Sequence, residues 1–83
     1  MNKQRREELF EVIDLLEEAH DRLSEIRDDE QDAFDAMPEG LQESSRGFAM
    51  QEALDTLDEF ENDIMALEKR IEEYAKPPKK PKK

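Results

Sequence analysis

The chain has a single histidine, and its spacing from a glutamate is that of a pair of metal ligands. His20 follows Glu17 by three residues, which puts both side chains on one face of a helix. Four-helix bundles that hold two metal ions use Glu-x-x-His pairs of this kind, together with further inward carboxylates. Here Ala19 takes the inward position, and only Glu61 comes near a matching height in the second half of the chain. We therefore predict no metal and no cofactor, and keep a ferritin-like bundle with Glu17 and His20 as ligands as an alternative.

Carboxylates form the most regular pattern in the sequence. Nine of them alternate four and three residues apart, with no basic residue in the row: Glu7, Glu11, Asp14, Glu18, Asp21, Glu25, Asp28, Asp32 and Asp35. On a helix they form one row about 42 Å long, and each neighbouring like-charged pair costs about 0.2–0.5 kcal/mol. Two interpretations stay open. The row is a solvated face that keeps the protein soluble, or it binds a basic partner, in the most specific case by imitating a phosphate backbone.

The remaining composition argues against an enzyme. The 83 residues include no cysteine, no glycine-rich phosphate loop, no Ser/His/Asp or Cys/His arrangement and no aromatic platform for nucleic-acid bases. Charged residues make up 45% of the chain and aromatic residues 6%, which is typical of long solvated helices rather than of a β-sheet. We predict a non-enzymatic, all-α protein.

Net charge divides the chain into a body and a tail. The whole chain carries −11, but residues 1–75 contain 8 basic and 24 acidic residues, a net charge of −16. This body should be repelled by nucleic acid and anionic membranes and attracted to basic proteins, including those that bind nucleic acid. Residues 76–83, with five lysines and three prolines, are expected to form a disordered tail. Contact of these lysines with nucleic acid, a membrane surface or the acidic row is the alternative.

The acidic row requires a long helix, and the sequence predicts two, joined by a turn. Asn2 can cap a first helix over residues 3–36. Pro38 disfavours helical geometry in the residue before it, and Gly40 tolerates left-handed angles, so a turn is predicted over residues 37–45. Because this connection is short, the two helices are expected to lie antiparallel as a hairpin.

The second helix is predicted over residues 46–75, and the prolines from Pro77 onwards end it. Ser44 and Ser45 are both candidates for its N-cap. Gly47 weakens this assignment, because a glycine inside a helix costs about 1 kcal/mol relative to alanine. The helix either runs through Gly47 or kinks there.

Apolar residues spaced alternately three and four apart form a seam on each helix, as in coiled coils. The first helix contributes Leu9, Val12, Leu16, Ala19, Leu23, Ile26, Ala33 and Met37. The second helix contributes Met50, Ala53, Leu57, Phe60, Ile64, Leu67, Ile71 and Tyr74. Because 83 residues form only a small core, we predict that the hairpin dimerises through these residues into a four-helix bundle.

Glu30 interrupts the first seam with a charge. An unpaired buried carboxylate is costly, so this side chain either reaches solvent or pairs with Arg27 or Arg46.

The turn and its flanks resemble a family of small acidic helical-hairpin proteins from phages and prophages of Gram-positive bacteria. The resemblance rests on the run Met37-Pro38-Glu39-Gly40-Leu41-Gln42-Glu43-Ser44-Ser45-Arg46-Gly47, between a helix that opens Met1-Asn2-Lys3 and one beginning at Met50. It covers residues 1–75 and implies a mobile-element setting, in which small acidic proteins that disable host enzymes are expected. The family is uncharacterised, so no functional residue is carried over.

No apolar stretch is long enough for a signal peptide or a membrane span, so we expect the cytoplasm of a bacterial host. The predicted function is a protein-interaction module, an inhibitor whose acidic row binds a basic, nucleic-acid-binding host protein. The alternative is a self-assembling structural or scaffold bundle.

Overall fold

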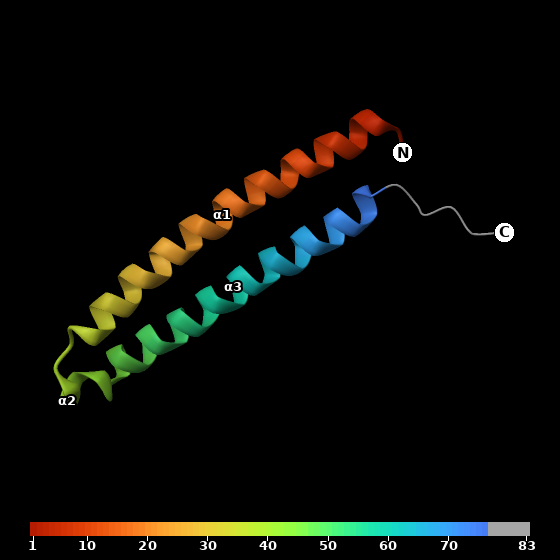
Figure 1. The fold of residues 1–83 in the computed structure, drawn as a ribbon. Helices are drawn as coiled ribbons and strands as arrows, with labels where there is room; N and C mark the ends of the chain where they lie inside the picture. The colour runs from red at the N-terminus through yellow and green to blue at the C-terminus, as the bar shows by residue number, and fades with distance from the viewer. Residues whose placement is uncertain (77–83) are drawn as a thin grey trace.

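The computed structural model describes residues 1–76 and contains two long helices with a short one between them (Figure 1). Their bounds are α1 (Lys3–Asp35), α2 (Glu39–Gln42) and α3 (Ser45–Ala75). The described residues contain no β-strand, which confirms the all-α class. Apart from Lys76, the predicted tail lies outside the described residues.

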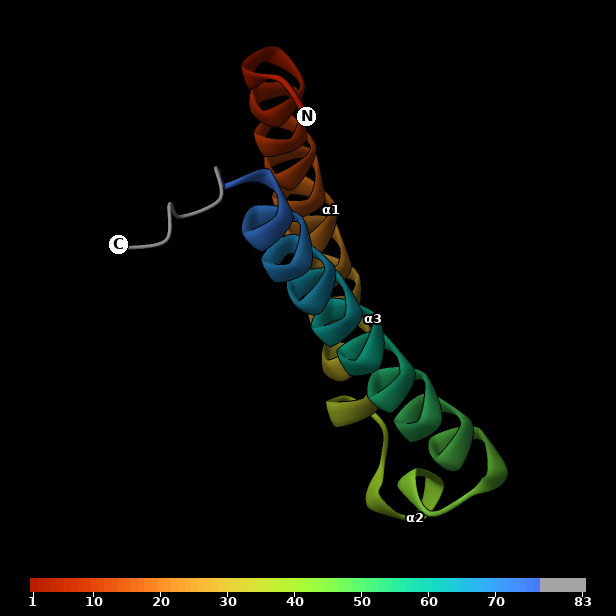
Figure 2. The same cartoon turned by 90° about the vertical axis from the view of Figure 1, so that its right-hand side faces the viewer.

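Helices α1 and α3 lie side by side and run in opposite directions, with α2 at one end (Figures 1 and 2). The molecule is elongated, with principal extents of 67 × 24 × 14 Å. The two long helices of the described residues form a single layer, so each has only one long helical neighbour, and most of its side chains are exposed. None of the described helices is long and apolar enough to cross a membrane.

Both long helices begin at a polar side chain that accepts a hydrogen bond from the first turn. Asn2 Oδ1 accepts from the Arg5 N–H at 2.8 Å, and Ser44 Oγ accepts from the Gly47 N–H at 3.4 Å. Ser44 rather than Ser45 is therefore the cap of α3, because its oxygen satisfies one of the N–H groups that a helix start leaves unpaired. Helix α1 ends, and α3 begins, one residue earlier than predicted.

The connection between α1 and α3 is held by Gln42. Its side-chain amide donates to the carbonyl oxygens of Phe34 at 3.1 Å and Met37 at 3.3 Å, at the end of α1. Helix ends leave carbonyl groups unpaired, so Gln42 closes α1 as a capping side chain. Gly47 is buried against the backbone of the same glutamine, and α3 runs through it without interruption.

Candidate interaction surfaces

The structure divides the predicted seam into two parts. Its first part faces the other helix and is at least half buried: Leu9, Leu16 and Leu23 of α1, Met37 just after α1, and Met50, Leu57, Ile64 and Ile71 of α3. The neighbours of these residues in the contact are Ile13, His20, Arg27 and Phe34 of α1, and Leu54, Glu61, Glu68 and Ala75 of α3. Four of these eight are polar or charged. The contact between α1 and α3 therefore consists of one row of apolar side chains from each helix and, beside it, a second row in which half of the side chains are polar or charged.

The second part of the predicted seam is exposed. It consists of Val12, Ala19, Ile26 and Ala33 of α1 and of Ala53, Phe60, Leu67 and Tyr74 of α3, with only Ala53 partly covered. We call these eight residues the apolar face. The side chains of Phe60 and Tyr74 are 48% and 71% exposed. The sequence pattern predicted which residues are apolar, but not which flank of each stripe meets the other helix.

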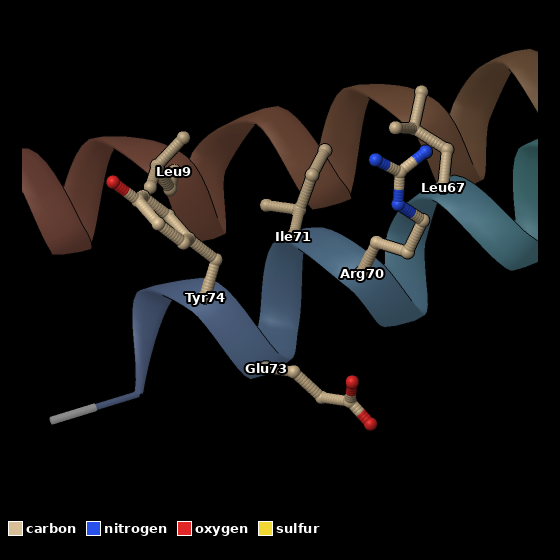
Figure 3. Close-up of a pocket in the computed structure, with 6 residues that line it drawn as sticks. All are labelled: Leu9, Leu67, Arg70, Ile71, Glu73 and Tyr74. Carbon is tan, nitrogen blue, oxygen red and sulfur yellow. The ribbon is translucent and has the colours of Figure 1, made fainter. Parts of the chain in front are cut away.

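The two halves of the apolar face lie on the same side of the helix pair. Ile26 of α1 and Ala53 of α3 line one open hollow. Leu9 of α1 lines another with Leu67 and Tyr74 of α3 (Figure 3). In Figure 3, Ile71 points towards α1 and Glu73 points away from it, and both border this hollow between the two helices.

A polar cluster lies in the middle of the contact between α1 and α3. Ser24 Oγ donates a hydrogen bond to Glu61 Oε1 at 2.6 Å, and His20 Nε2 lies 3.4 Å from the same oxygen. Arg27 Nε donates to Asp58 Oδ1 at 2.6 Å one turn further along. These bonds join residues at least 31 positions apart in the chain, so they fix the register of the two helices.

The hydrogen bond from Arg27 and the charge of Asp58 raise the pKa of Arg27. A base whose pKa is raised on folding stabilises the folded state wherever it is protonated in both states, and this contribution disappears as the pH rises through the folded-state pKa. Arginine is already fully protonated at neutral pH. The pair therefore contributes equally across the neutral range, and solvent screens it because both side chains are partly exposed.

Glu30 has neither of the partners expected for it. Within the described residues Arg27 pairs with Asp58, and Arg46 forms no ion pair. Glu30 instead lines the open hollow beside Ile26 and reaches solvent there. This is the first of the two alternatives that the sequence left open.

The two candidate metal ligands, Glu17 and His20, line one hollow, but they face different surroundings. His20 faces Glu61, whereas Glu17 is exposed and lies on the rim of a hollow that it shares with Met65. Within residues 1–76, no group of three or more His, Asp or Glu side chains converges as metal ligands would.

All nine carboxylates of the predicted acidic row are exposed: Glu7, Glu11, Asp14, Glu18, Asp21, Glu25, Asp28, Asp32 and Asp35. No ion pair among the described residues joins any of them to a basic side chain, and Asp35 alone accepts a side-chain hydrogen bond, from Gln31 at 2.9 Å. The three ion pairs that do form use Glu61, Asp58 and Glu72 of α3. Asp21 borders a hollow with Met65 of α3, and the charge of Asp28 contributes to the raised pKa of Arg27, but no member of the row is ion-paired within the described fold.

No protein-family model, curated protein or solved structure matches this chain. The resemblance to phage proteins therefore stays a prediction.

Proposed function

We propose that this protein is a non-enzymatic interaction module that works as a homodimeric four-helix bundle and binds a basic, nucleic-acid-binding host protein through its acidic row. The observation that carries the proposal is the exposure of all nine carboxylates without a basic partner in the described fold. Their mutual repulsion lowers the stability of α1. A basic protein surface would relieve this repulsion on binding.

The charge density of the row supports imitation of a nucleic acid. Nine charges over about 42 Å amount to one charge per about 5 Å, compared with one per about 3.4 Å along a single DNA strand. The row thus offers roughly two thirds of the charge density of one strand on a rigid support. A protein that binds nucleic acid non-specifically would be attracted to it and blocked by it. We place this inhibition in the cytoplasm of a bacterial host, in keeping with the resemblance to phage proteins.

The proposal can be tested by neutralising the row without changing its shape. The row variant carries Asp14→Asn, Glu18→Gln, Asp21→Asn and Glu25→Gln. The control variant removes four charges that are also exposed, from α3, through Glu52→Gln, Asp55→Asn, Glu59→Gln and Glu73→Gln. Both variants have the same net charge, so a difference between them reports position rather than total charge.

Immobilised wild-type, row and control proteins are incubated with nuclease-treated bacterial lysate, and captured proteins are identified by mass spectrometry. We expect the wild type and the control to capture a basic, nucleic-acid-binding protein that the row variant loses. Anisotropy of a labelled oligonucleotide should then show that the wild type displaces nucleic acid from this captured protein. Identical capture by all three proteins would refute a binding role for the row.

A second candidate function, a self-assembling structural bundle, is favoured by the exposed apolar face. It predicts assemblies that grow with concentration beyond a dimer. Light scattering over a concentration series separates this candidate from a discrete dimer. Replacing Leu57 and Ile64 by aspartate should dissolve the assembly in either case, because both side chains lie in the contact between α1 and α3.

A further inference from the structure

The apolar face is used neither by the contact between α1 and α3 nor by the acidic row. Each of its two lines spans 22 residues, from Val12 to Ala33 and from Ala53 to Tyr74, and the 21 steps between the ends cover about 32 Å of helix. Two adjacent helices give it a width of about 20 Å, and hence an area of roughly 600 Å² per chain. The largest apolar patch on a typical monomer measures about 300–600 Å² and often has a function, and this face, which includes the polar Glu30 and Thr56 at its hollow, reaches the upper end of that range. Two such faces would bury about 1,200 Å², the lower bound for a specific and stable interface.

The contact between α1 and α3 buries too little apolar surface to keep a single chain folded. Among the described residues, the buried hydrophobic side chains are Leu54, 7% exposed, and Ala75, fully buried. Glu61 and Arg27 occupy part of the same contact. A small chain with so little buried apolar surface needs a further partner to be stable.

We propose that the apolar face is covered by the same face of a second copy, related by a twofold axis that runs parallel to the helices. In this dimer α1 of each copy packs antiparallel on α3 of the other, and both α2 turns lie at the same end. The alternative axis, which crosses the helices, would pair α1 with α1 and put the turns at opposite ends. This inference rests on the dimer of the proposed function, but not on the acidic row.

Charge at the edge of the apolar face distinguishes the two arrangements. His20 faces Glu61 and Arg27 faces Asp58, so residues of α1 and α3 at equal height have numbers that add to about 83. Arg22 of α1 and Asp63 of α3 therefore lie at nearly the same height.

Both side chains are exposed on the flank of the face, and no ion pair within residues 1–76 uses either of them. Arg22 lines an open hollow with Ile26, and Asp63 lies three residues after Phe60. An axis parallel to the helices preserves height and sets Arg22 beside Asp63 of the second copy, twice per dimer. The crossed axis would instead bring Arg22 close to Arg22 of the second copy, because residues 22 and 23 are the midpoint of the α1 line. Opposite charges across an interface favour the first arrangement, and like charges disfavour the second.

A charge exchange tests the pairing, with the dimer dissociation constant measured by sedimentation equilibrium. Arg22→Glu and Asp63→Arg alone should each weaken the dimer about tenfold or more, and the double variant should return to within about threefold of the wild type. If the double variant loses as much dimerisation free energy as the two single variants together, the arrangement is overturned.

The face itself is tested by Phe60→Lys, with Met65→Lys as a matched control. Both side chains are exposed on α3, 48% and 55%, but Met65 lies on the opposite flank, in a hollow with Glu17 and His20. Phe60→Lys should give a helical monomer of 9.8 kDa, and Met65→Lys should remain a dimer. Circular dichroism checks that both variants stay helical. A dimer that tolerates Phe60→Lys would show that copies associate through another surface.

The direction of the axis has an independent readout, because the chain lacks cysteine and a single one can be introduced for a spin label. Gly40→Cys lies in α2, where an added side chain meets nothing within 4 Å. The proposed dimer puts the two labels at one end, less than about 30 Å apart, whereas the crossed axis separates them by about 50 Å, the length of α1. The longer distance would overturn the proposal. A monomeric wild type would also overturn it, while leaving the capture experiment on the acidic row unaffected.

Discussion

Two glycines lie close together in the chain, but only one of them is required by its surroundings. A Cβ atom on Gly47 would lie 2.8 Å or less from the Cα, C and O atoms of Gln42, whereas a Cβ on Gly40 would meet nothing within 4 Å. Gly47 is therefore needed because α3 begins directly against the residue that closes α1. The sequence identified Gly47 as an energetic cost to the helix, and the close approach to Gln42 is the reason for that cost.

Replacement of these glycines by alanine should have opposite effects. Gly47→Ala forces the backbone of Gln42 to move and should lower the free energy of unfolding by about 1–3 kcal/mol, the usual cost of overpacking. Gly40→Ala, inside α2, should be neutral or stabilise by up to about 1 kcal/mol, because it restricts the unfolded chain. Urea denaturation followed by circular dichroism at a fixed protein concentration measures both. Equal effects of the two substitutions would contradict the close contact at Gly47.

Polar residues within the contact between α1 and α3 define its register at the scale of single side chains. The pairs that Glu61 makes with Ser24 and that Asp58 makes with Arg27 depend on which residues of the two helices are level with each other. The sequence placed Glu61 near His20 in height, but expected Arg27 to be available for Glu30. Interhelical pairs could not be assigned from the sequence, because the spacing within one helix does not determine its alignment with another.

At the scale of the elements, the helix bounds were largely predictable because capping and breaking residues act locally. Asn2, Ser44 and Pro38 each act within one turn of their own position, and the observed ends of α1 and α3 differ from the predicted ones by one residue. The rotation of each helix about its axis was less predictable. An apolar stripe that is wide enough for two contacts does not show which side of it meets the other long helix. In the structure, Ile13 of α1 and Leu54 of α3, which lie beside the predicted seam, are part of the contact between α1 and α3.

The N-cap of α3 gives a prediction at this scale, since Ser44 and its neighbour Ser45 differ only in position. Ser44→Ala removes the acceptor for the Gly47 N–H and should lower the free energy of unfolding by about 1 kcal/mol. Ser45→Ala changes the same chemical group in the first residue of α3, where it serves as no cap, and should cost nothing. Chemical denaturation of both variants checks this. A larger loss from Ser45→Ala would mean that α3 begins one residue later.

At the scale of the whole molecule, the acidic row and the apolar face lie on different sides of the helix pair. Binding a basic partner and pairing with a second copy therefore do not compete for the same residues. In the proposed dimer the two rows lie on diagonally opposite helices, so each row can bind its own partner. One dimer should accordingly carry two partner sites.

Salt should raise the melting temperature of this protein and lower its affinity for a basic partner. Repulsion among the carboxylates of residues 1–75, whose net charge is −16, is screened as the ionic strength rises, because the Debye length falls from about 30 Å at 0.01 M to about 3 Å at 1 M. The melting temperature followed by circular dichroism should therefore rise between 0.01 M and 0.5 M sodium chloride. Affinity for a basic partner should fall over the same range, because it arises from the same charges.

In the row variant, which has four fewer charges on α1, the salt dependence of the melting temperature and that of the affinity should both be weaker. In the α3 control variant, only the salt dependence of the melting temperature should weaken. A wild-type melting temperature that falls as salt is added would show that basic groups compensate the charges of the row.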